Sequence, residues 1–496
     1  MNDTSTFPDP TYRDTVLAPL FEGVKIHYAT HMAAINRAHL VMLVEAGILP
    51  RATGAQIAGA LAAIEAETDI AALTYTGAFE DYFFVVEDQL KRRIGPDLAG
   101  GLHTARSRND MDHTMFKLAL MRRGLDLAEH LDDLIGAMIL TAERERATLI
   151  VAYTHGQPAQ PTTFGHYLAA AIEVAQRDAT RLIGALNTVD LCPMGAAAIT
   201  TSGFPIDRRR MADLLGFRVP LINSYGCIAS VDYVTGLYSA IKLVFLHLGR
   251  VVQDFQFWSA FEVGQLHVPN SLVQISSIMP QKRNPVPIEH MRHLASVTCG
   301  RCDTVVNTMH NTPFTDMNDS EGEVQQAGYA AFQSGTRMLR LMAAFVPACS
   351  INADRVRANS DAACITITEL ADTLVRDGGL TFRQAHEIAA ATARAVIDFG
   401  QPLSEGYAGF CAAFLGMGHG AVPLDEAAFR AAVSPANFVA RRDREGGPAP
   451  AALDPALACA RATLDKALRP SVAALRDRYA KAARDLDTTF AALLED

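Results

Sequence analysis

The sequence predicts an all-α protein, because its apolar residues have helical spacing and strand patterns are scarce. Between residues 116 and 150, apolar side chains recur at three- and four-residue steps, at Met121, Leu125, Ala128, Leu131, Ile135, Met138 and Ala142. A second stripe has the same spacing at Leu237, Ile241, Val244, Leu248 and Val251. Both stripes approach the seven-residue repeat of bundled helices, so we interpret them as the core of a long helical bundle.

The chain has 496 residues, more than one hydrophobic core usually serves, and we expect three helical domains. Residues 1–105 form the predicted N-terminal domain, residues 106–357 the central bundle and residues 358–496 the C-terminal domain. Closely spaced Gly and Pro residues at 155–161 and 279–287 predict loops or helix junctions. Residues 444–455 have the composition of a linker, which precedes a final helical stretch interrupted at Pro470.

The formal net charge of −10 argues against a nucleic-acid partner or an anionic membrane surface, because both attract basic proteins. A small anionic substrate is compatible with this charge, since one local group of cations is enough to bind it. The polar N-terminus lacks the apolar core of a signal peptide, and charged residues or glycines interrupt the longest apolar stretches. We therefore expect a cytoplasmic protein.

Eight cysteines in so long a chain do not predict a disulfide framework. Cys299 and Cys302 form one CxxC pair, but no second pair or His pair stands at zinc-ligand spacing. The surroundings of the pair have a helical pattern, which does not fit a thioredoxin-like redox site. We expect reduced, structural thiols and no metal.

The segment SSIMPQKRNP, residues 276–285, has an unusual composition for a structural loop. Turn chemistry explains Ser276, Ser277 and the prolines, but it does not explain Lys282 and Asn284 two residues apart. A serine hydroxyl can act as a base when a cation and N–H donors stabilise its alkoxide in a site that excludes water. Lys282 supplies such a cation, and Asn284 supplies amide donors for a carboxylate.

Two further segments carry groups that suit a dicarboxylate. HTARSRND, residues 103–110, contains Arg106 and Arg108, and the guanidinium group binds carboxylates in a bidentate manner. The alternative is a solvated cap before a helix that starts near Met111, with Asp110 in the capping role. THGQPAQP, residues 154–161, contains His155, which titrates near neutrality. A lone histidine of this kind is more often a structural core residue.

Taken together, these three segments resemble the three signature regions of the aspartase/fumarase superfamily, and argininosuccinate lyase is the most similar family within it. HTARSRND resembles HTGRSRND, THGQPAQP resembles THxQxAQP, and SSIMPQKRNP resembles GSSxMPxKxNP. Residues 192–208, CPMGAAAITTSGFPIDR, and residues 380–389, LTFRQAHEIA, resemble two further stretches of that family. The similarity covers roughly residues 20–400.

This resemblance implies a homotetramer with a 20-helix core, in which each active site combines the signature regions of three subunits. It implies that Ser276 is the catalytic base on a mobile loop, and that Lys282 and Asn284 stabilise its charge and hold the reacting carboxylate. His155 matches a histidine that acts as an acid or an orienting group, and Glu289 matches its carboxylate partner.

The resemblance also implies a set of substrate-binding residues, namely Ser107, Arg108, Asn109, Thr154, Gln157, Ser277, Met279 and Asn284. The implied reaction removes a proton α to a carboxylate and forms a dianionic aci-carboxylate, which clustered cations and N–H donors stabilise in the transition state. A general acid then protonates the departing nitrogen. This chemistry calls for no cofactor and no metal, and the small-molecule substrate is the only partner expected besides the other subunits.

Departures from the family pattern concern the amine half of the substrate. Ile275 replaces the glycine before the two serines, and Val286 replaces an aspartate. In an ungapped comparison of residues 311–324, polar family residues become Asp316, Asn318, Glu321 and Val324. Phe83 stands where the family has a histidine, and Lys25 corresponds loosely to a guanidinium-binding aspartate. The fumarate half of the site is therefore retained, whereas the amine half is altered.

We accordingly predict a carbon–nitrogen lyase that reversibly eliminates an amine from an N-substituted aspartate, similar to an aminopolycarboxylate, and releases fumarate. Lost hydrogen bonds to a polar substrate are costly in a dry site, which argues against argininosuccinate itself. Two alternatives stay open. One is an authentic argininosuccinate lyase of arginine biosynthesis, and the other is a non-enzymatic structural protein similar to lens crystallins.

Overall fold

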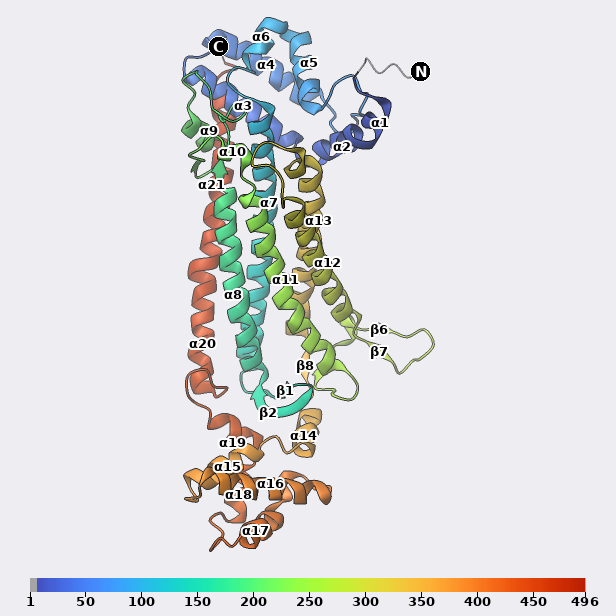
Figure 1. Ribbon diagram of the computed structural model, residues 1–496, viewed down its shortest axis with the longest axis vertical. Helices are drawn as coiled ribbons and strands as arrows, with labels where there is room; N and C mark the ends of the chain where they lie inside the picture. The colour runs from blue at the N-terminus through green and yellow to red at the C-terminus, as the bar shows by residue number, and fades with distance from the viewer. Residues whose placement is uncertain (1–6, 496) are drawn as a thin grey trace.

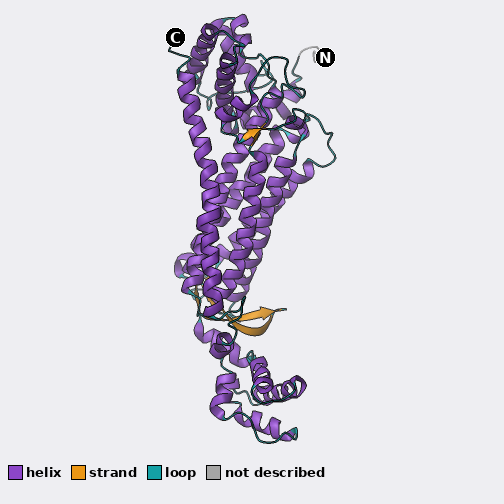
Figure 2. Cartoon of the chain, turned by 90° about the vertical axis from the view of Figure 1, so that its left-hand side faces the viewer, coloured by secondary structure: helices purple, strands orange, loops and turns teal. Residues whose placement is uncertain are grey.

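A computed structural model describes residues 7–495, and it confirms the predicted all-α class (Figures 1 and 2). Five long helices lie side by side in one elongated bundle. They are α7 (Arg108–Arg144), α8 (Phe164–Val189), α11 (Asp232–Ser259), α12 (Val286–Thr308) and α13 (Gly322–Ala348). Both predicted apolar stripes are buried in this bundle, on α7 and α11 respectively, with Val251 only partly buried.

Helix α7 begins at Arg108 because Ser107 caps it. The Ser107 side chain accepts from the backbone N–H of Asp110, and the Asp110 side chain accepts from the backbone N–H of Ser107, which is a capping box. The predicted start near Met111 with Asp110 as the cap is therefore wrong by three residues. With 37 residues, α7 spans about 55 Å.

The N-terminal helices pack around the upper end of the bundle in Figure 1, together with two short helices from the middle of the chain. They are α1 (Pro10–Tyr12), α2 (Ala18–His27), α3 (Ala29–Glu45), α4 (Arg51–Glu67), α5 (Tyr82–Ile94), α6 (Pro96–Gly101), α9 (Arg208–Leu215) and α10 (Gly226–Ala229). The apolar side chains of α3 to α5 join the core of the bundle.

A separate small core lies at the other end of the molecule, around Leu374, Phe410 and Phe429. Its region consists of α14 (Ala353–Ala362), α15 (Ile367–Arg376), α16 (Phe382–Asp398), α17 (Tyr407–Gly416), α18 (Glu426–Ala432) and α19 (Pro435–Ala440). The chain then returns along the bundle through α20 (Pro450–Thr463) and α21 (Arg469–Ala491).

Because the chain returns along the bundle, the predicted C-terminal domain, residues 358–496, is not one unit. Leu453, Leu464 and Phe490 belong to the main core, so the last two helices are part of the bundle. The predicted linker 444–455 is shorter than expected, since α20 already begins at Pro450. Pro470 follows a five-residue π-helix, Leu464–Leu468, which joins α20 to α21, so the helical stretch changes its geometry at this proline but does not end.

Short strands connect the helices. β1 (Leu149–Thr154) and β2 (Gln157–Thr163) form an antiparallel hairpin where the sequence predicted only a loop or helix junction. His155 and Gly156 form its turn with positive φ angles of 55° and 74°. The other ladders have two residues in each strand: β3 (Leu191–Cys192) with β4 (Val219–Pro220), β5 (Leu266–His267) with β8 (Ser350–Ile351), and β6 (Gln274–Ile275) with β7 (Arg283–Asn284).

Among the described residues, one helical stretch, Gly226–Ser259, is long and apolar enough to cross a membrane by length and composition alone. It contains α10 and α11, and α11 packs against α8 and α12 within the bundle. Its apolar residues therefore have a role as protein core. All eight cysteines are free, and Cys299 and Cys302 lie on α12.

Candidate active site

The three signature segments lie far apart within one chain. Ser107 to Asn109 are at the upper end of the bundle in Figure 1, where α7 starts, whereas His155 is in the β1–β2 turn beyond the other end of α7. The length of α7 puts about 55 Å between these two segments. Ser276 and Lys282 lie on the loop of the β6–β7 hairpin, residues 274–284, which extends from the side of the bundle.

At the upper end, Ser107, Arg108 and Asn109 form one connected group. The Ser107 hydroxyl donates to Asn109 Oδ1 at 2.9 Å, and the Asn109 amide donates to Asp316 Oδ2. Arg108 donates to Asp81 at 2.7 Å and lies 3.2 Å from Glu80. Its guanidinium group also stacks 4.9 Å from the centre of the Phe84 ring. The structure therefore orients these residues before any substrate binds.

The segment 192–208 supports this group from behind. Asp110 Oδ2 accepts from the backbone N–H groups of Gly195 at 2.9 Å and Ala197 at 3.0 Å. Gly195 and Ala197 have positive φ angles, which aim their N–H groups at the start of α7. Arg106, by contrast, is buried and donates to Asn36 at 2.7 Å, so it has a structural role.

Five carboxyl groups surround Arg108 at this end, and we call them the acidic cluster: Glu80, Asp81, Asp112, Asp316 and Glu321. Burial, together with the charges of Asp81 and Asp316, raises the pKa of Asp112 to about 8. Burial and the neighbouring Asp112 and Asp316 also raise the pKa of Glu321 well above its usual range. The cluster holds more negative charge than the guanidinium group of Arg108 can balance.

His113 faces the acidic cluster from α7. Its side chain has no exposed surface, and its Nε2 lies 3.9 Å from Asp316 Oδ1. Within residues 7–495, neither of these two atoms has a hydrogen-bond partner, whereas His113 Nδ1 lies 3.1 Å from the Tyr233 hydroxyl. Burial lowers the pKa of His113 to about 3, so its ring is neutral at neutral pH. His113, Asp316 and Glu321 bring one ligand atom each to within 4.8 Å of one another.

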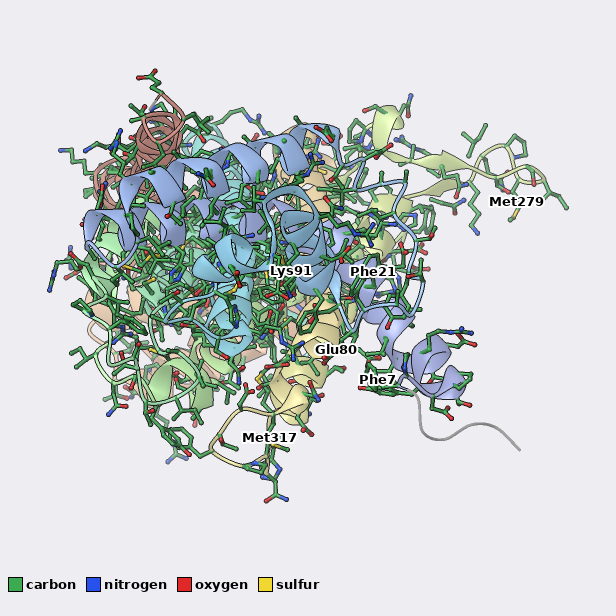
Figure 3. All side chains as sticks on the ribbon, turned by 90° about the horizontal axis from the view of Figure 1, so that it is seen from above. Phe7, Phe21, Glu80, Lys91, Met279 and Met317 are labelled. Atoms are coloured by element: carbon green, nitrogen blue, oxygen red, sulfur yellow. The ribbon has the colours of Figure 1, made fainter. Side chains whose placement is uncertain are left out.

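On the β6–β7 hairpin, the predicted site residues make few contacts with the rest of the chain, unlike those at the start of α7. Ser276 Oγ accepts from the backbone N–H of Met279 at 3.0 Å, so the turn holds the serine in place only through its own backbone. Lys282 and Ser277 are exposed, and within the described chain the Lys282 ammonium has no partner. Arg283 donates to the carbonyl oxygen of Val268 at 2.7 Å and anchors the base of the hairpin. Figure 3 shows Met279 far outside the body of the molecule.

The residues of the second signature segment are also exposed. Thr154, His155 and Gln157 surround the β1–β2 turn, and Glu289 lies exposed in the first turn of α12. No described residue contacts the His155 ring by a hydrogen bond or an ion pair, so one chain does not bring His155 and Glu289 together. Asn284, in β7, is half-buried.

Lys25 and Phe83, which the sequence comparison placed near the amine half of the substrate, do not face the acidic cluster. Lys25 lies in α2 and donates to Glu22 at 3.0 Å and to the carbonyl oxygen of Leu73. Phe83 is buried in the core of the bundle. Asp112 and His113 were not predicted as site residues. His113 lies four residues after Asn109, and this step places Asn109 and His113 on the same face of the helix.

Comparison with protein families matches a lyase family model to residues 11–300 and an argininosuccinate lyase C-terminal model to residues 364–440. The chain is 60% identical over 464 residues to argininosuccinate lyase 2 of Agrobacterium fabrum, which covers 93% of this chain and 92% of the relative. It is 36% identical over 363 residues to argininosuccinate lyase of Methanosphaera stadtmanae, and this match covers 73% of this chain and 77% of the relative.

Solved structures agree with these matches. EDDS lyase in complex with formate has a TM-score of 0.85 at 29% identity, covering 98% of this chain and 99% of that chain. A variant of EDDS lyase with bound fumarate has the same TM-score at 28% identity, covering 99% and 97%. Class II fumarase from Schistosoma mansoni shares the fold, with a TM-score of 0.66 at 16% identity, covering 85% and 91%.

The bundle and its signature segments therefore define the class of the protein as the aspartase/fumarase superfamily. Within that class, the chain belongs to the argininosuccinate lyase family, and it is a carbon–nitrogen lyase that releases fumarate. This excludes the crystallin-like structural alternative.

Proposed function

We propose that this lyase reversibly eliminates an amine from an N-substituted aspartate of the aminopolycarboxylate type, and that its active sites are shared between the subunits of a homotetramer. The succinyl half of the substrate binds to Ser107, Arg108, Asn109 and Thr154, with further contacts from Gln157, Ser277, Met279 and Asn284. Ser276 removes the proton, and Lys282 stabilises the alkoxide that makes this possible.

Two observations support shared sites: the distance between the segments within one chain, and the exposed β6–β7 hairpin. The hairpin carries Ile275 and Ile278, which are 80% and 82% exposed in a single chain. Two exposed isoleucines beside a catalytic serine are costly in water, and contact with another subunit would cover them and exclude water from the site. A second subunit would also bring the start of its own α7 to the hairpin of the first.

The proton to be removed lies α to a carboxylate, and its removal leaves a dianion. Arg108 and Lys282 neutralise this charge, while the Asn284 amide donates to the carboxylate oxygens. His155, with Glu289 as its carboxylate partner, orients or protonates the departing nitrogen.

The observation that carries this proposal is that Asn109 lies between retained residues and an altered one. Its neighbours Ser107 and Arg108 are retained, whereas the residue that accepts from its amide is Asp316, one of the altered positions. Incubation with fumarate and a panel of amines, followed by mass spectrometry of the adducts, tests the proposal. Adducts with several amines are expected, and a reaction with arginine alone would contradict the reassigned substrate.

The second candidate function is argininosuccinate cleavage, which the 60% identity to argininosuccinate lyase 2 favours. Complementation of a bacterial strain that lacks this step distinguishes the two. Growth without added arginine supports argininosuccinate as the substrate, and failure to grow despite soluble, active protein excludes it.

A further inference from the structure

A cleft of about 530 Å³ lies between α3, α7, α9 and α21, which meet at the upper end of the bundle in Figure 1, and we call it the α21 cleft. Small-molecule sites typically have volumes in this range. Large apolar side chains of α7, α9 and α21 form most of its walls, namely Leu118, Met121, Leu125, Leu214, Leu215 and Leu486. The cleft is separate from the candidate active site, because Arg122 in its lining lies about 20 Å along α7 from Asn109.

Three arginines line the α21 cleft, and two of them already have carboxylate partners. Arg37 pairs with Asp487 at 3.0 Å, and Arg476 pairs with Asp126 at 2.7 Å. Arg122 is exposed, and it has no hydrogen bond or ion pair within residues 7–495. The positive charge of Arg122 is therefore open to a ligand in the cleft.

His31 of α3 lines the cleft together with Arg122. Burial and the charges of Arg122 and Arg123 lower the pKa of His31 to about 4, and burial and the same two arginines lower the pKa of His27 to about 4. No described carboxylate raises either pKa, so this end of the cleft has an excess of positive charge. The His31 ring is neutral at neutral pH and has no hydrogen-bond partner among the described residues, so it can still donate one N–H to an anion.

We propose that the α21 cleft binds an amphipathic monocarboxylate, a molecule with one carboxylate group and an apolar body. The carboxylate accepts from the Arg122 guanidinium group and from the ring N–H of His31, and the apolar body lies against the leucines of the walls. One cation and one neutral donor balance a single negative charge, so a second charge on the ligand would enter the apolar part of the cleft without a partner. This inference goes beyond the lyase reaction, because it uses no residue of the candidate active site.

The apolar walls explain why a carboxylate alone is not the expected ligand. An ion pair with an exposed arginine contributes little in water. Each CH₂ group that leaves water for the cleft adds hydrophobic free energy. Affinity should therefore rise with the length of the alkyl chain, from acetate to octanoate.

Isothermal titration calorimetry of the intact protein tests the inference with octanoate, 1-octanol and octylammonium, which share an alkyl chain and differ in the head group. The titrations contain saturating fumarate, which keeps octanoate from the carboxylate-binding residues of the candidate active site. We expect octanoate to bind at least tenfold more tightly than 1-octanol, because its carboxylate accepts charge-assisted hydrogen bonds. Octylammonium should bind most weakly of the three, and acetate should show no binding.

A charge substitution connects the preference to Arg122. Arg122→Gln should weaken octanoate binding by tenfold or more and should remove its advantage over 1-octanol. Arg209→Gln is the matched control, because Arg209 lies exposed on α9 outside the lining of the cleft. This control should leave both affinities unchanged.

A second substitution fills the cleft without changing its charge. Ala483 is exposed and lines the cleft from α21, so Ala483→Phe adds volume there without replacing a core residue. It should abolish the binding of octanoate and of 1-octanol. Ala474→Phe is its control, since Ala474 lies exposed on the same helix outside the cleft.

Three results would overturn the inference. The first is equal affinity of the original protein for octanoate and 1-octanol. The second is octanoate binding that both Arg122→Gln and Ala483→Phe leave intact, which would place the ligand elsewhere. The third is no octanoate binding together with a changed oligomeric state of Ala483→Phe in light scattering, which would make the cleft a contact between copies of this chain.

Discussion

The acidic cluster and the β6–β7 hairpin differ in how much of their environment one chain provides. At the cluster, Arg108 and Asn109 already bond to Asp81 and Asp316, and His113 is fully buried. On the hairpin, Ser276 accepts only from backbone N–H groups of its own turn, and Lys282 is exposed. The groups expected to bind the succinyl half are thus positioned within one chain, whereas those expected to perform the chemistry are not.

This difference has a physical reason. A serine can act as a base only where water is excluded and its alkoxide is stabilised. The role proposed for Ser276, which is half-buried on an exposed hairpin, therefore requires neighbours beyond its own turn. Carboxylate binding by Arg108 needs only a fixed guanidinium group, which the pair with Asp81 provides. Under the proposed function, we expect the hairpin to gain neighbours before catalysis, whereas the start of α7 needs only the substrate.

Ser276→Ala should produce the largest effect. Loss of the general base should lower kcat by about 10²–10⁴-fold, while the oligomeric state stays unchanged. Steady-state kinetics and light scattering check both statements. Ser277→Ala is the matched comparison and should lose less, because Ser277 is assigned to substrate contact. Equal losses in the two variants would remove the distinction between them.

Mixing two inactive variants tests whether the two regions act across subunits. Ser276→Ala and Arg108→Ala chains are co-expressed with different tags, and mixed oligomers are isolated. If Ser276 and Arg108 of one site come from different chains, about a quarter of the sites in random mixtures contain both native residues. Activity should then recover to about a quarter of the original. No recovery in verified mixed oligomers would place both residues in one chain.

The sequence predicts some features of the molecule better than others. The helical class follows from the spacing of residues such as Leu131 and Ile135, and the structure confirms it. The return of α20 and α21 to the bundle was missed, because the stripe of Leu453, Leu464 and Phe490 does not say which core it joins. The exposure of Ser277 and Lys282 on the hairpin could not be predicted either, since a motif identifies residue types and not their surroundings.

His113 shows what sequence reasoning omitted within the site. A lone histidine is most often a core residue, and His113 is indeed buried, so its four-residue step from Asn109 was too weak a signal to select it. Its missing partner at Nε2 depends on Asp316, which is more than 200 residues away in the chain. Only the folded structure brings the two atoms to the same place.

Arg108→Lys should have an intermediate effect on kcat/KM, and it should weaken substrate binding rather than proton removal by Ser276. Lysine keeps the charge but cannot form a bidentate bond to a carboxylate, so kcat/KM should fall by about tenfold to a hundredfold, mainly through KM. Arg92→Lys is the control, since Arg92 has a 74% exposed side chain in an ordinary helical ion pair. A fall in kcat with unchanged KM would instead assign Arg108 to the chemical step.

Asp112→Asn should have the smallest effect, and it should appear in stability. Burial raises the pKa of Asp112 from its ordinary value near 4 to about 8, so the folded protein keeps a proton that the unfolded chain releases. The stabilisation from this proton is complete below about pH 4 and is lost as pH rises through about 8. Asparagine does not titrate. The melting temperature of the variant relative to the original should therefore rise by about 4 °C between pH 5 and pH 9, as measured by calorimetry without substrate. Asp319→Asn should show no such rise, and parallel pH profiles for Asp112→Asn and the original protein would mean that Asp112 is already ionised beside Arg108.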